Sequence, residues 1–97
     1  MAKAYWICFY RSISNPTALA EYARLAGPAI QSGGGRFLAR GTPAKTFEAG
    51  KDQRTVVIEF DSVQQATSTY QSAAYQAAVR VIEGSVERDI RIMEGIA

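Results

Sequence analysis

Two charged residues lie inside stretches that otherwise have the apolar pattern of buried β-strands. Arg40 ends the stretch "RFLAR", and Glu59 lies within "TVVIEF". A buried charge is costly unless it is paired, so one interpretation is a structural Arg40–Glu59 pair or a salt bridge across an interface. The other interpretation is a site in which Arg40 anchors an anionic or carbonyl-bearing ligand and Glu59 is a candidate catalytic base.

Three consecutive glycines in "SGGGRFLARG" raise the question of a phosphate-binding loop. Such a loop follows a strand and opens a helix, whose N-terminal amides point at the anion. The order here is the opposite, because the glycines follow a helical pattern that ends near Ser32 and precede a strand. We therefore expect one of Gly33, Gly34 and Gly35 to adopt a positive φ and reverse the chain direction.

The residue types that are missing exclude whole classes of chemistry. Histidine is absent and Cys8 is the only cysteine, so an intrachain disulfide is impossible and zinc, haem and Cys–His chemistry lose their usual groups. We expect no metal and no cofactor. Cys8 lies in the apolar run "YWICFY" and is expected to be a small buried hydrophobic residue rather than a reactive thiol.

Composition and charge indicate one folded domain over residues 1–97. Hydrophobic residues make up 47% of the chain, which is enough apolar surface to offset the entropy of the unfolded chain. The net charge is only +2 and the basic residues are scattered, so nucleic acid is not an expected partner. The sequence contains neither an apolar stretch long enough for a membrane span nor a recognisable signal peptide, so we expect no membrane association and a cytoplasmic location.

Hydrophobic periodicity predicts the first half of the chain as strand, helix and strand. The aromatic and branched residues 4–13 form the first strand. Asn15 and Pro16 start a helix that carries an apolar stripe and ends near Ser32. Gly27-Pro28 is expected to kink or briefly break this helix near its end. The stretch "RFLAR" is the second strand, in which strict alternation places Arg36, Leu38 and Arg40 on one side.

The second half is predicted as a hairpin, a bent helical segment and a last strand. Gly50, Lys51 and Asp52 form the turn of a hairpin that leads into the strand "TVVIEFDS". Ser62 and Gln65 make a capping box, and the helical residues 62–82 are expected to bend at Gln71-Ser72. In "VERDIRIMEGI", Ile90 and Ile92 alternate with Asp89 and Arg91 in a strand with a period of two.

Aromatic side chains are the candidates for the walls of a pocket. Trp6 and Tyr10 lie on one side of the first strand, where they contribute either to a dimer core or to a pocket wall. Tyr22, Tyr70 and Tyr75 fall on helical stripes, where aromatic residues more often belong to the core, although their hydroxyls need partners. The candidate ligand-binding set is therefore Arg40, Trp6, Tyr10 and Tyr22.

The predicted order of elements is that of the ferredoxin-like βαββαβ plait. This α+β fold has a four-stranded antiparallel sheet with its helices on one face. A sheet face exposed to water is normally polar, but "AYWICFY" is apolar at every position, so both faces of the first strand need cover. An identical subunit related by a twofold axis supplies that cover, and we expect a homodimer in the form of a dimeric α/β barrel.

Two long stretches, "GPAIQSGGGRFLARGTP" and "VVIEFDSVQQATSTYQSAAYQAA", resemble the domain-of-unknown-function family 1330. The resemblance covers nearly the whole chain, and it implies a dimeric α/β barrel of bacterial type with no established reaction. The first strand is more aromatic than expected of this family, which implies a different pocket wall. The matching residues are Gly34-Gly35, Phe37, Arg40-Gly41, Glu59-Phe60, Tyr70, Ser72 and Tyr75-Gln76.

Three functions remain open at this stage. The first is binding of a small aromatic or keto-type ligand in a cleft beside the sheet, with Arg40 as its polar anchor. The second is a cofactor-free enzyme of the oxygenase or isomerase type, in which Glu59 takes a proton and Arg40 holds the resulting anion. The third is a purely structural dimerisation module. The fold by itself does not decide among them.

Overall fold

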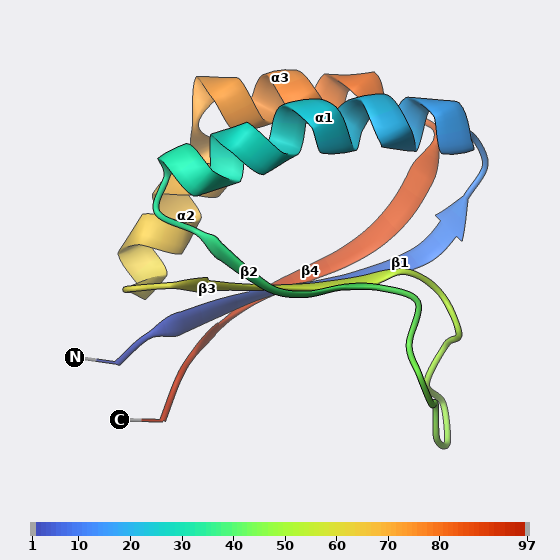
Figure 1. Ribbon diagram of the computed structural model, residues 1–97, viewed down its shortest axis with the longest axis horizontal. Coiled ribbons are helices and arrows are strands. Elements are labelled where there is room, and N and C mark those ends of the chain that lie inside the picture. Colours follow the sequence, from blue (N-terminus) through green and yellow to red (C-terminus); the bar gives the residue numbers. More distant parts are fainter. Residues whose placement is uncertain (1, 97) are drawn as a thin grey trace.

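Four strands and three helices make up the fold, and the computed structural model describes residues 2–96. The helices all lie on one face of a single antiparallel sheet, whose strand order is β2-β3-β1-β4 (Figure 1). This is the predicted ferredoxin-like arrangement. The elements are β1 (Ala4–Ile13), α1 (Pro16–Ser32), β2 (Arg36–Gly41), β3 (Thr55–Phe60), α2 (Val63–Gln71), α3 (Ala73–Val81) and β4 (Val86–Glu94).

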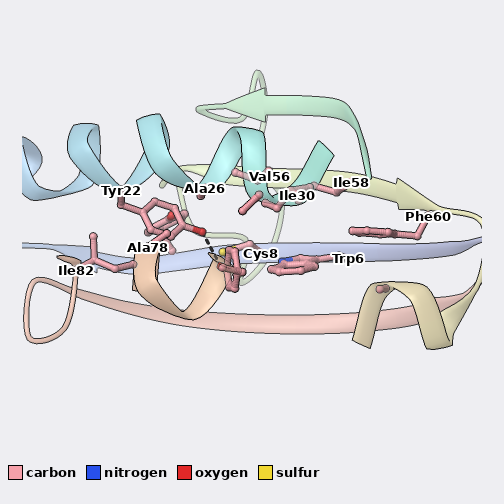
Figure 2. Close-up of a cluster of buried hydrophobic side chains, with 14 of the residues drawn as sticks. Trp6, Cys8, Tyr22, Ala26, Ile30, Val56, Ile58, Phe60, Ala78 and Ile82 are labelled. Atoms are coloured by element: carbon pink, nitrogen blue, oxygen red, sulfur yellow. Dashed lines mark hydrogen bonds between the residues drawn. The ribbon is translucent and has the colours of Figure 1, made fainter. Parts of the chain in front are cut away.

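The central strand β1 separates the core from an uncovered face. Trp6 and Cys8 point into the layer between sheet and helices, where Figure 2 shows them packed with Ile58 and Phe60. Trp6 pairs with Ile58 on one side and with Ile92 on the other, so three neighbouring strands contribute to the same layer. The alternation predicted for residues 4–10 is confirmed, because Ala4, Trp6, Cys8 and Tyr10 are all buried.

The face of the sheet away from the helices is apolar at its centre and charged at its ends. Tyr5, Ile7 and Phe9 alternate along β1 on this face, and Phe9 remains 39% exposed. Arg36 pairs with Glu59 at one end, whereas Arg91 pairs with Asp89 at the other. The loop of residues 42–54 projects from the sheet on this same side (Figure 1).

Local signals account for the helix boundaries. The Asn15 side chain accepts a hydrogen bond from the backbone N–H of Ala18 at 3.1 Å, as an N-cap does. Of the kink or break predicted at Gly27-Pro28, the break does not occur, since α1 continues to Ser32 with Pro28 inside it. Tertiary packing outweighs the hydrogen bond that proline cannot donate, because residues on both sides of Pro28 are buried against the sheet.

Ser72 both ends α2 and begins α3, which confirms the predicted bend. Its Oγ donates to the carbonyl oxygen of Thr69 at 2.7 Å and accepts from the N–H of Tyr75 at 3.2 Å. Ser62 caps α2 by accepting from the N–H of Gln65 at 3.1 Å. The Gln65 side chain reaches back to the N–H of Asp61 rather than to that of Ser62, so the predicted capping box is shifted by one residue.

The connection between β2 and β3 differs from the predicted hairpin in two ways. It is a loop of residues 42–54, in which Gly50 N–H donates to Phe47 O at 2.9 Å, rather than a tight turn at 50–52. In addition, the pairing skips Leu38, because Phe37 lies opposite Ile58 and Ala39 lies opposite Val57. This β-bulge corrects the predicted alternation: Arg40 lies opposite Val56, on the helix-covered face with Phe37.

Gly34 provides the predicted chain reversal after α1, with a φ of +94°. Replacing Gly34 with alanine is expected to lower the free energy of unfolding by about 1–2 kcal/mol, because an L side chain is strained at positive φ. Its Cβ would also meet the Gln65 side chain. Urea denaturation followed by circular dichroism measures the change. Gly27→Ala is the matched control, since its Cβ enters open space within a helix and should not destabilise the protein.

Candidate functional site

A narrow pocket lies between α1 and the sheet, at the side of the sheet formed by β2 and β3. Its volume is about 30 Å³, which is room for one or two water molecules. We call it the α1 pocket. Its lining residues come from β1, α1, β2 and the start of β3: Cys8, Tyr10, Tyr22, Ala23, Ala26, Gly27, Ile30, Phe37, Arg40, Arg54, Val56 and Ile58.

The shape of the α1 pocket follows from small residues on the helix. Ala23, Ala26 and Gly27 have little side-chain volume, so a small space, which we call the slot, remains between α1 and the strands. Val56 and Ile58 of β3 form an apolar floor, since both point to the helix-covered face. Walls of this mainly apolar kind suit the apolar part of an organic ligand.

Two arginines bring positive charge to this slot. The Arg40 guanidinium lies 4.8 Å from the centre of the Phe37 ring and is exposed, because β2 is an edge strand. The expectation that Arg40 is buried is therefore wrong. Arg54 is half-buried just before β3, where its carbonyl oxygen accepts from Tyr10 N–H at 3.0 Å. Arg54 Nε is buried and makes no hydrogen bond with any residue from 2 to 96.

A hydrogen-bonded cluster of two phenols and an arginine lies next to the α1 pocket. The hydroxyls of Tyr22 and Tyr75 are 2.6 Å apart, and the Tyr22 bond is the dashed line in Figure 2. Arg88 of β4 donates from Nη1 to both hydroxyls, at 3.0 Å to Tyr22 and 3.2 Å to Tyr75. Its guanidinium also lies 5.8 Å from the centre of the Tyr10 ring. The buried phenols thus have the partners that their hydroxyls require.

Burial keeps the phenols and the thiol near Arg54 and Arg88 protonated. Desolvation raises the pKa of Tyr10 to about 12 and also raises the pKa values of Tyr22 and Tyr75. The pKa of the Cys8 thiol is raised by burial as well, although the positive charge of Arg88 opposes the shift. These neighbours are neutral at pH 7 and do not compensate the arginine charge.

Arg40, Arg54 and Arg88 share a further property with the exposed Arg80. Among residues 2–96, none of these four arginines forms a salt bridge with a carboxylate. Four other arginines do: Arg11 and Arg91 with Asp89, Arg24 with Glu21, and Arg36 with Glu59 and Asp61. Arg54 and Arg88 are partly buried, and a partly buried guanidinium without a counter-ion is costly, so the helix-covered face of the sheet favours an anion.

The structure does not bring Glu59 to Arg40, and the hypothesis of an Arg40–Glu59 pair is not supported. Glu59 lies on the uncovered face of the sheet, where its Oε1 accepts from Arg36 Nε at 3.0 Å. Its Oε2 is 3.4 Å from the hydroxyl of Tyr5. Arg36 also donates to Asp61, and the bonds from Lys3 and Arg36 lower the pKa of that carboxyl. Glu59 therefore belongs to a surface ion-pair cluster.

The other sequence-predicted residues divide between pocket and core. Tyr10, Tyr22 and Arg40 line the α1 pocket together. Trp6 does not, because it is 1% exposed and packs its ring against Phe60, Tyr70 and Tyr75. Within residues 2–96 no three His, Cys, Asp or Glu side chains gather as metal ligands. None of the helices in that same range is long and apolar enough to cross a bilayer.

Arg54 and Arg88 are the site residues that the sequence reasoning missed, although alternation points to both. Arg54 is two residues before Val56 and four before Ile58, so it lies on their side of β3. Arg88 precedes Ile90 and Ile92 at the same spacing in β4. In each case the signal is an arginine that lies on the same face of its strand as the apolar residues that follow it at intervals of two.

Comparison with solved structures supports the fold. A protein of unknown function from Rhodopseudomonas palustris, RPA0582, superposes with a TM-score of 0.75 at 16% identity, over 99% of this chain and 84% of that one. A dimeric ferredoxin-like protein of unknown function from Thermobifida fusca superposes with a TM-score of 0.56 at 16% identity, over 96% and 91% of the two chains.

A third structure is a conserved protein of unknown function from Bacteroides thetaiotaomicron, described as a "possible oxidoreductase". Its TM-score is 0.57 at 12% identity, over 96% of this chain and 95% of that one. At such identities the likeness concerns the fold alone. A search of curated proteins finds no match to this sequence. Residues 3–96 do match the domain of unknown function DUF1330, and the chain therefore belongs to the DUF1330 family.

Proposed function

We propose that this protein is a homodimer that binds a small, planar organic anion in the α1 pocket. The observation that carries the proposal is Arg54, whose buried Nε has no hydrogen-bond partner among the described residues. A buried donor without an acceptor costs about 1–3 kcal/mol, and a carboxylate or enolate oxygen of a ligand would remove that cost. Arg40 offers a second guanidinium at the same pocket.

The apolar part of the ligand is expected to be an aromatic or keto-type group. The slot between α1 and β3 is lined by alanine, glycine and branched side chains, which favour a flat apolar body. An aromatic or keto-type anion is larger than the volume of the α1 pocket, which is about 30 Å³, so part of the pocket wall has to move on binding. Arg40 is exposed at the outer edge, where it stacks on Phe37, and it is the side chain free to swing outward.

Binding is proposed rather than catalysis because of which groups line the α1 pocket. Among the described residues, no carboxylate lines it, and Glu59 lies on the opposite face of the sheet. The protonated groups that do line it, Cys8, Tyr10 and Tyr22, have pKa values raised by burial and are poor bases at neutral pH. A cofactor-free enzyme remains the alternative, and turnover of a bound probe would establish it.

Calorimetric titration with benzoate and phenylpyruvate tests the proposed site. Arg54→Met and Arg40→Met are each expected to weaken binding by about 10- to 100-fold, the contribution of a hydrogen bond to a charged group. Arg40→Lys should recover only part of the loss, because lysine lacks the planar pair of donors. The melting temperature should change little in Arg40→Met, since Arg40 is exposed and has no carboxylate partner within residues 2–96.

Arg80→Met is the matched control for these titrations. Arg80 is an exposed arginine on α3, and it is not among the residues that line the α1 pocket. Its replacement should leave the affinity for both probes unchanged. If neither anion binds, or if the Arg40 and Arg54 variants bind as tightly as Arg80→Met, the ligand-binding function is wrong and a structural dimerisation module remains.

The homodimer is proposed from the uncovered face of the sheet. Tyr5, Ile7 and Phe9 lie there between two ion-pair clusters, and an identical face turned about a twofold axis would bury the apolar centre. A sheet-to-sheet dimer of this kind is a dimeric α/β barrel. The dimeric Thermobifida fusca protein with the same fold is consistent with this assembly.

Ile7→Asp is expected to convert the dimer into a folded monomer at micromolar concentration. A carboxylate at the centre of the interface would be buried opposite Arg91, whose guanidinium already binds Asp89, so the added charge would have no free counter-ion. Sedimentation velocity measures the change, and circular dichroism establishes that the monomer is folded. Val63→Asp is the control, because Val63 is an exposed residue at the start of α2 on the other side of the sheet. A wild-type monomer, or a dimer that survives Ile7→Asp, contradicts this assembly.

A further inference from the structure

A second cavity lies on the opposite side of the helical layer, between α3 and β4. Its volume is about 380 Å³, within the range typical of small-molecule sites. The α1 pocket, by comparison, holds about 30 Å³. Val79 of α3 and Ile90 of β4 give it one apolar side, with Ile82 buried just after α3, whereas polar atoms form most of its lining. Arg88 and Glu83 are the charged residues that line it.

One nitrogen of the Arg88 guanidinium forms hydrogen bonds within the protein, and the other two have no partner among the described residues. Nη1 donates to both phenols, Tyr22 and Tyr75, which fix its position. Nε and Nη2 make no hydrogen bond with any residue from 2 to 96, and neither atom is sealed from solvent, unlike Arg54 Nε. Arg88 lines the cavity, so these two nitrogens are donors that a ligand there could use.

The charge of Arg88 also lacks compensation. Its nearest polar partners are phenols that burial keeps protonated, and none of the carboxylates described here forms a salt bridge with it. Glu83, on the exposed turn after α3, lines the same cavity without pairing with Arg88. A fixed guanidinium with unpaired donors beside the apolar side of the cavity, at Val79 and Ile90, matches a carboxylate attached to an apolar body.

We propose that the cavity between α3 and β4 is a binding site, separate from the α1 pocket, for a small apolar carboxylic acid that Arg88 anchors. Tyr22 and Tyr75 are positioning residues for that anchor. The apolar body lies against Val79, Ile82 and Ile90. A carboxylic acid that also carries an ammonium group, such as an apolar amino acid, gains a partner in Glu83 at the rim of the cavity.

Titration of the full chain with three probes, followed by the amide chemical shifts of α3 and β4, tests the site. 3-Phenylpropionate should bind here, whereas phenethylamine, which lacks the carboxylate, should not. Phenylalanine should bind more tightly than 3-phenylpropionate, and Glu83→Gln should abolish that difference. If Glu83→Gln leaves the difference unchanged, or if phenethylamine binds as well as the acids, the proposed recognition is wrong.

Two substitutions separate this site from the structural role of Arg88 and from the α1 pocket. Arg88→Met should weaken 3-phenylpropionate binding at least about 10-fold, but it also removes the partner of two phenols. Val79→Phe fills the cavity without touching Arg88 and should cause a similar loss while the Tyr22–Tyr75 bond stays intact. Ala23→Leu fills the α1 pocket instead and should leave binding at this cavity unchanged.

The pattern of losses distinguishes failure of this site from failure of the α1 pocket. If Ala23→Leu abolishes benzoate binding and Val79→Phe does not, benzoate binds only in the α1 pocket. If Val79→Phe abolishes the changes in amide chemical shift and Ala23→Leu does not, the ligand binds in the cavity between α3 and β4. The second site is ruled out if 3-phenylpropionate perturbs no residue of α3 or β4, or if its binding survives both Arg88→Met and Val79→Phe.

Discussion

Trp6→Ala is expected to lower the free energy of unfolding by about 3–5 kcal/mol, the cost of removing a large aromatic side chain from a packed core. Trp6 is 1% exposed and occupies the centre of an aromatic cluster. Its ring centre lies 5.0 Å from that of Tyr75 in an edge-to-face arrangement and 6.0 Å from that of Phe60 in a stacked one. The neighbouring rings cannot move into the space that the substitution leaves, because β3, α2 and α3 each hold one of them.

Urea denaturation followed by far-ultraviolet circular dichroism measures this change, and Trp6→Phe is the matched control. Phenylalanine retains most of the buried area and the aromatic contacts, so it should cost about 1–2 kcal/mol. A loss below about 1 kcal/mol for Trp6→Ala would mean that the cluster is not the core described here. It would also reopen the earlier hypothesis that Trp6 forms the wall of a ligand pocket.

The sequence predicts the fold well where a strand is central and poorly where it is at an edge. β1 pairs with a neighbour on each side, and its apolar residues therefore alternate without interruption from Ala4 to Tyr10. β2 pairs only with β3, and the bulge at Leu38 changes the face of every residue after it. No local pattern in "RFLAR" reveals an extra residue. The position of Arg40 could not be deduced from alternation for this reason.

Part of the candidate site could have been predicted and part could not. Arg54 and Arg88 share the phase of buried apolar residues in their strands, so a stricter reading of alternation would have identified both. The hydrogen bond between Tyr22 and Tyr75 joins residues 53 positions apart and depends on how α1 and α3 pack. The partner of Glu59 depends on strand register, because Arg36 reaches it only across the β2–β3 pairing.

The buried phenols give the protein a steep loss of stability at alkaline pH. In an unfolded chain a tyrosine ionises with a pKa near about 10. In the folded protein, burial raises the pKa of Tyr10 to about 12 and also raises those of Tyr22 and Tyr75. Above about pH 10 the unfolded chain therefore binds fewer protons than the folded one, and stability falls as the pH rises. Below that pH the phenols are protonated in both states and stability is unaffected.

The expected slope is about 1.4 kcal/mol per pH unit for each phenol that ionises only after unfolding, or about 4 kcal/mol for three. Because domains of this size are stable by about 5–15 kcal/mol, cooperative unfolding is expected within about one to four pH units above 10. Phenolate absorbance and far-ultraviolet circular dichroism are recorded together during an alkaline titration, and the absorbance of Tyr10, Tyr22 and Tyr75 should appear only as the circular dichroism signal is lost. Tyr10→Phe removes one titrating group and should reduce the slope by about a third with little change at neutral pH. Phenolate absorbance from all five tyrosines appearing near pH 10 in a protein that is still folded would show that Tyr10, Tyr22 and Tyr75 are not buried as described.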